Sequence, residues 1–255
     1  MKYSTAIIAA LAGLAAALPS PPAAASQQQQ PRAAPRRVGR TKKSGFNRKD
    51  VEYPTYSSNW AGAVQIGNGF NKVVGTITVP QVSGDASAAA SAWVGIDGDT
   101  CQTAILQTGV SFYGDGSFDA WYEWIPDYSH SFANFAISAG DQIRMTVDAS
   151  STTQGVATLE NLTTGKQVSH TFTSTPSTLC ETNAEWIVED FESNGQLVPF
   201  ANFGTVTFTD ASASGSSGSV TPSGAQIFDI RDSSGQVLTN CGTSGSDLSC
   251  SYTGN

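Results

Sequence analysis

The sequence predicts an all-β protein, a sandwich of antiparallel sheets, from three observations. Short segments rich in β-branched and aromatic residues recur along the chain, and most alternate between apolar and polar positions. No long segment has the spacing of an amphipathic helix. Turn signals rich in glycine, asparagine and serine separate the segments. These features are typical of stacked antiparallel sheets.

The elements follow in order along the chain. Strands are expected at Val73–Val79, Gln142–Asp148, Val156–Glu160, Lys166–Phe172, Thr205–Thr209 and Gln226–Arg231. Turns are expected at Gly67–Gly69, Gly114–Gly116, Thr164–Gly165 and Ser233–Gly235. The only glycosylation sequon begins at Asn161, where a hairpin turn is expected to expose it, so Asn161 is a candidate glycosylation site.

Charge divides the chain into two parts. Residues 1–50 hold 9 basic residues and 1 acid, whereas residues 51–255 hold 4 basic residues and 20 acids. The apolar stretch Ala6–Leu18 behind Lys2 predicts a secretory signal peptide over residues 1–18. Residues 19–51 are rich in Pro, Ala, Gln and Arg and cannot bury a core, which predicts a basic propeptide. Residues 52–255 are long enough for one domain.

These parts predict a secreted, extracellular protein. The propeptide is expected to inhibit the acidic domain by charge attraction at neutral pH and to leave as the carboxylates are protonated. A basic arm that binds nucleic acid is the alternative, but export argues against it. The apolar stretch is too short for a membrane span, so no membrane partner is expected, and the mature protein is expected to be a monomer.

Four cysteines in an exported chain predict two disulfides with three possible connectivities. Cys241 and Cys250 are close enough in sequence to join a terminal hairpin, which would leave Cys101 and Cys180 to close a long loop. Neither a CxxC pair nor an HExxH motif is present, so no metal site or cofactor is expected.

Strand alternation gathers polar and aromatic side chains on one face. The expected members of that face are Trp93, Gly95 and Asp97; Gln107; Asp119, Trp121 and Glu123; and Glu185 and Glu189. If their strands are neighbours, these side chains line one cleft that contains carboxylates. A solvated sheet face is the alternative interpretation, but large aromatic side chains favour contact with a ligand.

Familiar hydrolytic machinery finds little support in the sequence. His130 and His170 stand without a partner motif, and a lone histidine is more often structural than catalytic. Neither a GxSxG elbow nor the Asp-Thr/Ser-Gly turn of the acid proteases occurs. Carboxylates and carboxamides therefore remain as the candidate catalytic groups.

Five segments, in order, closely resemble the fungal glutamic peptidases, the eqolisins. They are Ser57–Gly62 (SSNWAG), Trp93–Gly109 (WVGIDGDTCQTAILQTG), Asp119–Trp124 (DAWYEW), Glu160–Gly165 (ENLTTG) and Asn183–Glu192 (NAEWIVEDFE). The resemblance implies two curved antiparallel sheets of the concanavalin A-like type and a secreted acid endopeptidase that acts on proteins and peptides. It also implies a catalytic pair, Gln107 and Glu189. The residues expected to surround that pair are Trp60, Trp93, Asp97, Asp119, Trp121 and Glu123.

The implied mechanism uses a bound water molecule. Glu189 would take a proton from the water and return it to the leaving amine, while Gln107 would donate a hydrogen bond to the oxyanion. This requires the two side chains to meet across adjacent strands. Some members of the family carry an extra cysteine pair after the strand of Glu189, which this chain lacks, so the loop at Ser193–Gln196 is expected to be looser or shorter.

Two rival functions use the same side chains. A glycoside hydrolase would place Glu123 and Glu189 on either side of a glycosidic bond. A lectin-like module would stack sugars on Trp60, Trp93 and Trp121 and would need no catalytic pair. Degradation of a protein substrate in acid separates the peptidase from both.

Overall fold

The computed structural model describes residues 54–83 and 85–254. The expected signal peptide, residues 1–18, and propeptide, residues 19–51, lie outside the described residues. Strands, turns and irregular loops make up the described part of the chain, in agreement with the predicted all-β class. Among these residues, no helix is long and apolar enough to cross a membrane.

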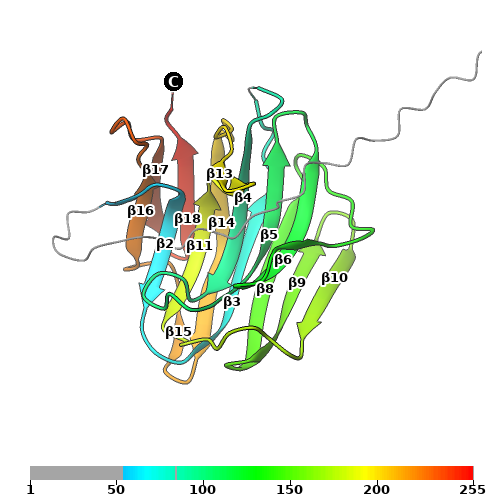
Figure 1. Cartoon of the computed structure of the whole chain (residues 1–255), viewed down its shortest axis with the longest axis vertical. Coiled ribbons are helices and arrows are strands. Elements are labelled where there is room, and N and C mark those ends of the chain that lie inside the picture. The colour runs from blue at the N-terminus through cyan, green and yellow to red at the C-terminus, as the bar shows by residue number, and fades with distance from the viewer. Residues whose placement is uncertain (1–53, 84, 255) are drawn as a thin grey trace, which may run out of the picture. The chain divides into compact units, whose positions relative to one another are not determined.

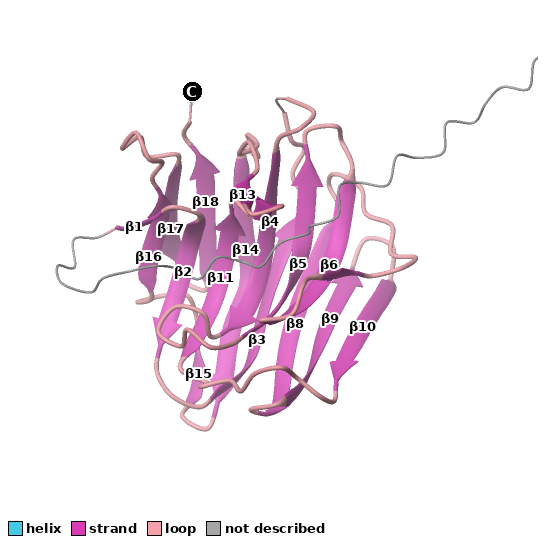
Figure 2. Ribbon diagram, viewed as in Figure 1, coloured by secondary structure: helices cyan, strands magenta, loops and turns pink. Residues whose placement is uncertain are grey.

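Two eight-stranded sheets build the fold (Figures 1 and 2). The first sheet has the order β1 (Thr55–Ser57), β16 (Gln226–Ile230), β2 (Trp60–Ile66), β11 (Asn183–Glu189), β4 (Ala89–Ile96), β5 (Ile105–Tyr113), β6 (Phe118–Ile125) and β7 (His130–Ser131). The second contains β10 (Lys166–Phe172), β9 (Gln154–Asn161), β8 (Gln142–Ser151), β3 (Phe70–Thr78), β14 (Thr205–Gly215), β18 (Asp247–Tyr252) and β17 (Thr239–Ser244), with β15 (Gly218–Val220) paired to β14. All pairs are antiparallel except β1 with β16, which is parallel.

The main core lies between the two sheets, where alternating positions of both point inward. In β8, for example, Ile143, Met145 and Val147 are fully buried while the residues between them are partly exposed or exposed. The strands of the first sheet behave differently, because β4, β5 and β11 are buried at every position. Their outer face, the one turned away from the second sheet, carries a separate apolar cluster of Trp60, Val64, Trp93, Ile105, Trp121, Ile125, Ile187 and Phe228.

The six predicted strands occur in the structure; β10 has the predicted bounds, and the other five differ from the prediction at one or both ends. β14 continues past the predicted end at Thr209 to Gly215, across an irregularity at Asp210, which has a positive φ of 50°. The small residues beyond Asp210 carry little β propensity, which is why the sequence underestimates this strand. β16 ends at Ile230, one residue before the predicted end.

The segment after β11, where a looser or shorter loop is expected, is an ordered hairpin. β12 (Glu192–Ser193) and β13 (Gln196–Leu197) form a tight hairpin. Its two turn residues, Asn194 and Gly195, have φ values of 56° and 77°. An Asn-Gly pair with both φ values positive is the preferred two-residue hairpin turn, so a local signal in the sequence could have predicted this element.

Asn161 contradicts the expected exposed sequon. The β9–β10 hairpin forms as predicted, but Asn161 is only 1% exposed. Its Nδ2 donates to Oδ2 of Asp141 at 2.8 Å, and its Oδ1 accepts from the backbone N–H groups of Thr163 and Thr164. The amide that a glycan would modify is therefore part of the folded interior. The side chain organises the turn, which turn statistics alone do not reveal.

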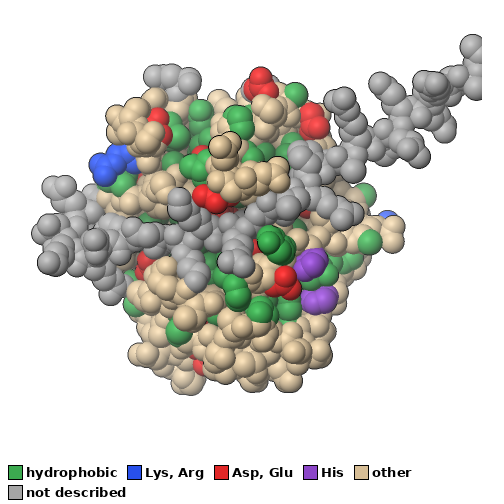
Figure 3. Space-filling model, in the orientation of Figure 1, with side chains coloured by type: hydrophobic (Ala, Val, Ile, Leu, Met, Phe, Trp, Pro, Cys, Tyr) green, Lys and Arg blue, Asp and Glu red, His purple; other side chains and the backbone are tan. Residues whose placement is uncertain are grey.

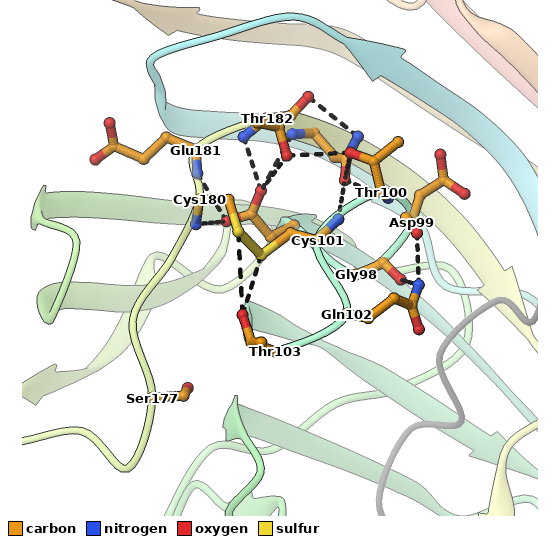
Figure 4. The surroundings of a disulfide bond; sticks show 12 residues. Gly98, Asp99, Thr100, Cys101, Gln102, Thr103, Ser177, Cys180, Glu181 and Thr182 are labelled. Carbon is orange, nitrogen blue, oxygen red and sulfur yellow. Dashed lines mark hydrogen bonds between the residues drawn. A yellow bond between two sulfur atoms is a disulfide. The ribbon is translucent and has the colours of Figure 1, made fainter.

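Two disulfides join Cys101 to Cys180 and Cys241 to Cys250. The first ties the loop after β4 to the segment that enters β11 (Figure 4). The second lies between β17 and β18, where the two cysteines are opposite each other in the register. Asp97 approaches both sulfurs of the first disulfide, but sulfurs bonded to each other are not thiolate ligands, so this cluster is not a metal site.

Candidate active site

Five neighbouring strands of the first sheet, β2, β11, β4, β5 and β6, present the predicted site residues other than Asp97 on one face. Glu189 on β11 is opposite Ser91 on β4. Gln107 on β5 is opposite Gly95 on β4 and Glu123 on β6. Because paired and alternate residues share a face, Glu189, Trp93, Gln107 and Glu123 all belong to the outer face.

The expectation that Gln107 and Glu189 lie on adjacent strands is wrong. β4 runs between β5 and β11, and the register partners of the two residues on β4, Gly95 and Ser91, are four positions apart. The two side chains therefore lie on the same face on either side of β4 and are offset along it, with Trp93 between their partners. Strand order depends on pairings between distant segments, which alternation within one strand cannot reveal.

Glu189 is fully buried and receives a hydrogen bond on each carboxylate oxygen. Nε1 of Trp93 donates to Oε2 at 2.9 Å, and Nδ2 of Asn59 donates to Oε1 at 3.4 Å. The indole N–H can only donate, so it fixes Oε2 as an acceptor. These contacts orient the carboxylate and match the acceptor character of an ionised carboxyl.

Gln107 is held by Glu123 on the neighbouring strand. Its Nε2 donates to Oε2 of Glu123 at 2.6 Å, and both side chains are fully buried. An amide nitrogen carries two N–H groups, and this contact uses one of them. The bond fixes the direction in which the carboxamide points.

Two glycines make room for the tryptophans around Gln107. A Cβ on Gly95 would lie 2.8 Å from the Trp93 ring and 3.4 Å from Cβ of Gln107. A Cβ on Gly109 would lie 2.5 Å from Cβ of Trp93 and 2.9 Å from the Trp121 ring. Real Cβ atoms do not approach other atoms so closely, so the rings occupy space that side chains at these positions would fill. The Gly residues in WVG and QTG are thus part of the site.

The other expected residues take different places. Trp60 packs edge-on against Trp93, with ring centroids 5.1 Å apart. Asp119 is partly exposed and accepts a 2.9 Å hydrogen bond from Oγ of Ser131. Asp97 accepts the backbone N–H groups of Cys180, Glu181, Thr182 and Asn183, so it anchors the disulfide-linked loop. Asp97 therefore stabilises the segment that leads into β11, the strand that carries Glu189.

Buried carboxyls surround the face. Burial, together with the charges of Asp97 and Asp99, raises the pKa of Glu185 well above its usual range. Burial and the charge of Glu189 raise the pKa of Asp190 to about 8. Glu185 shares the outer face with Glu189, and its two oxygens have no hydrogen-bond partner among the described residues. Both groups are therefore protonated in acid, where their burial is least costly.

The two histidines lie away from the Glu189 contacts. His170 stacks on Tyr122 with ring centroids 4.0 Å apart, and His130 stacks on the same ring at 5.6 Å. Burial, followed by the charge of His130, lowers the pKa of His170. Figure 3 shows the two histidines side by side on one surface. Their stacking on a tyrosine agrees with a structural role.

Asn59 is the site residue that the sequence reasoning missed. It lies directly before Trp60 in the SSNWAG motif, and its backbone carbonyl also accepts the N–H of Asp190. Ser57 fixes the same turn, because its Oγ accepts the N–H of Trp60 at 3.1 Å. The position of Asn59 inside a motif that already contributes Trp60 was the available signal.

Fold and site together define a class of protein. It is a β-sandwich protein whose candidate active site is made of carboxyl, carboxamide and indole groups and whose histidines stand apart. The comparisons with known proteins then give the family.

Residues 58–252 match the Peptidase A4 family. Aspergillopepsin-2 of Aspergillus niger is 53% identical over 221 residues, 77% of this chain and 78% of that protein. Scytalidopepsin B of Scytalidium lignicola is 48% identical over 99% of this chain and 100% of that protein. A crystal structure of scytalido-glutamic peptidase with a transition state analog inhibitor superposes with a TM-score of 0.74 at 52% identity, covering 77% of this chain and 98% of the other. The chain belongs to the Peptidase A4 family and is a glutamic-type endopeptidase.

Proposed function

We propose that this endopeptidase is secreted and that it hydrolyses peptide bonds with a water molecule activated by Glu189 and Gln107. The observation that carries the proposal is the pair of hydrogen bonds from Trp93 and Asn59 to the two oxygens of Glu189. A general base must present a fixed acceptor oxygen to the water that it deprotonates. The relative with a TM-score of 0.74, a scytalido-glutamic peptidase, binds a transition state analog inhibitor, which supports peptide-bond hydrolysis by this fold.

Each catalytic group has a distinct task. Glu189 takes a proton from the water as the oxygen attacks the scissile carbonyl carbon, and it later gives that proton to the leaving amine. Gln107 donates an N–H to the developing oxyanion, and Glu123 holds its amide in position through the 2.6 Å hydrogen bond. A carboxamide keeps its hydrogens at every pH, so this donor functions in acid.

Substitution of each group tests the dyad. Glu189→Gln and Gln107→Ala should abolish casein digestion at about pH 3 to 4 while leaving the protein folded, since loss of one oxyanion donor alone costs roughly 10²- to 10³-fold. Glu160→Gln and Gln167→Ala are matched controls on β9 and β10 of the second sheet. Normal digestion by either site variant would remove that residue from the mechanism.

The family assignment sets aside the rival sugar-cleaving and sugar-binding functions, which no further observation favours. The two disulfides agree with an oxidising compartment outside the cell. We also propose that residues 1–18 direct export, that residues 19–51 form an inhibitory propeptide and that the mature enzyme is a monomer. Mass spectrometry of the secreted product locates the mature N-terminus. A synthetic peptide of residues 19–51 should inhibit the mature enzyme near pH 6, where carboxylates are ionised. It should dissociate from the enzyme near pH 3, where most carboxylates are protonated.

A further inference from the structure

A cavity of about 480 Å³ opens beside the end of β11 that carries Glu189. Its wall includes Tyr56, Ser58, Asp190, Leu197, Ile230, Arg231 and Asp232. Asp232 brings a carboxylate next to Arg231, but its Oδ1 accepts hydrogen bonds from Ser234 and from the backbone N–H of Gln236, so it is held within its own turn. Ser58 directly precedes Asn59, which donates to Glu189, and Asp190 directly follows Glu189. The backbone N–H of Asp190 donates to the carbonyl of Asn59 at 2.9 Å, which fixes the cavity wall to the site. A peptide bound at Glu189 thus has this cavity within reach of its flanking residues.

Arg231 is the one basic side chain among the described residues that line the cavity. Of the four basic residues in the described part of the chain, Lys72, Arg144 and Lys166 belong to the second sheet. Arg231 alone follows a strand of the first sheet. In Figure 3, the Lys and Arg side chains of the described residues that are in view lie at the left and right edges of the molecule.

The guanidinium of Arg231 is held in place by an aromatic ring. It lies over the ring of Tyr56, with Cζ 4.3 Å from the ring centroid. Within residues 54–83 and 85–254, no carboxylate forms an ion pair with it. Stacking on an aromatic ring fixes the plane of the guanidinium group and leaves the N–H groups in that plane able to bind an acceptor.

A second unsatisfied group lies in the same cavity. Oδ1 of Asp190 is buried and has no hydrogen-bond partner among the described residues. Because the pKa of Asp190 is raised to about 8, the group is a neutral carboxyl in acid and does not repel an anion. Leu197 and Ile230 add apolar wall between the polar groups. A ligand with an apolar stem and an anionic end matches this set.

On this basis, and given the proposed function, we infer that the cavity is a substrate subsite in which Arg231 binds a carboxylate of the peptide. The carboxylate is either an aspartate or glutamate side chain near the scissile bond or the C-terminus of a short peptide. All of these groups are at least partly ionised at pH 4, since their ordinary pKa values lie near 3.3 to 4.3. The subsite would select such peptides although the rest of the site is acidic.

Matched peptides test the inference at pH 4. One set places Asp or its isostere Asn at each of four positions on either side of one scissile bond, and a second set compares free and amidated C-termini. With the wild-type enzyme, kcat/KM should be about five-fold higher for the anionic member at one position, the upper range of a partly exposed ion pair. The set that shows the preference identifies the source of the carboxylate.

Variants attribute the preference to Arg231. Arg231→Gln should remove the preference for the anionic peptide. Arg231→Glu should reverse it, so that a peptide with Lys at the same substrate position is cleaved better. Lys166→Gln, which removes a positive charge from β10 on the second sheet, should keep it. Equal cleavage of anionic and neutral peptides by the wild-type enzyme would overturn the subsite and leave the proposed function intact. If no peptide were cleaved, both would fail.

Discussion

Trp93 Nε1 donates a 2.9 Å hydrogen bond to Oε2 of Glu189, although the two residues are 96 positions apart in the sequence. Both are fully buried. Trp93 also lies on β4, the strand that separates Gln107 from Glu189. Its side chain therefore connects this central strand to the proposed general base, Glu189. The orientation of Glu189 should therefore depend on the indole N–H and on the space that the ring occupies.

Trp93→Phe tests the N–H. The variant keeps an aromatic ring and loses the donor, and hydrogen bonds to charged groups contribute about 1.5 to 3 kcal/mol. We expect kcat/KM for a peptide substrate to fall about 10- to 100-fold in acid. Trp124→Phe is the matched control, because its Nε1 donates to Oγ of Ser177 and its ring packs in the core between the sheets. Equal activity of the two variants would contradict the role of Trp93.

Gly95→Ala tests the space that the Trp93 ring occupies. The new Cβ would lie 2.8 Å from the Trp93 ring and would displace it from its place between Gln107 and Glu189. Overpacking of this kind typically costs about 1 to 3 kcal/mol of stability, and we expect activity to fall with it. Gly242→Ala, where an added Cβ meets nothing within 4 Å, should leave both quantities unchanged. Thermal unfolding and peptide turnover of the two variants give the comparison.

Stability should be greatest in acid and should decline toward neutral pH. Burial is the main cause of the raised pKa of Glu185, of Asp190 (to about 8) and of Asp229 (to about 6). A carboxyl whose pKa is higher in the folded chain contributes stability that is complete below its unfolded pKa, near 3.8 for Asp, and that is lost as pH rises through its folded pKa. The loss should therefore extend from about pH 4 to about pH 8. Urea unfolding across that window measures it.

Asp190→Asn should flatten this pH dependence. The amide cannot ionise, so the variant should lose less stability between pH 4 and pH 8, by on the order of a few kcal/mol. Asp115→Asn is the control, because a side-chain hydrogen bond from Ser117 lowers the pKa of Asp115 and its contribution changes only at the acid end. An Asp190→Asn protein with the wild-type slope would show that the buried carboxyl does not set the response.

The two disulfides should differ in their effect on stability. Cys101 and Cys180 are 79 residues apart, whereas Cys241 and Cys250 are 9 apart. Loop-closure entropy predicts a loss of about 4 to 5 kcal/mol when the long loop is opened and about 3 kcal/mol for the short one. Double Cys→Ser variants of each pair, compared by urea unfolding, test this order. A larger loss from the short pair would contradict the entropic account.

Alternation along single strands was enough to predict which side chains of β4, β5, β6 and β11 share the outer face. The outer face of β6 holds Trp121 and Glu123, and that of β5 holds Gln107, because a strand turns successive side chains to opposite faces. The same reasoning could not find Asn59, which reaches Glu189 from 130 positions away, or Arg231 over Tyr56. Such contacts depend on which distant segments pair.

The sequence by itself determined the all-β class, the strands and the face on which each side chain lies, since these follow from local periodicity and from turns. Only the tertiary structure decided that β4 separates Gln107 from Glu189, that Asn161 is buried and that Asp190 and Glu185 lie in low-dielectric surroundings. Strand order, burial and the resulting pKa shifts arise from packing between segments far apart in the chain, and no local pattern carries that information.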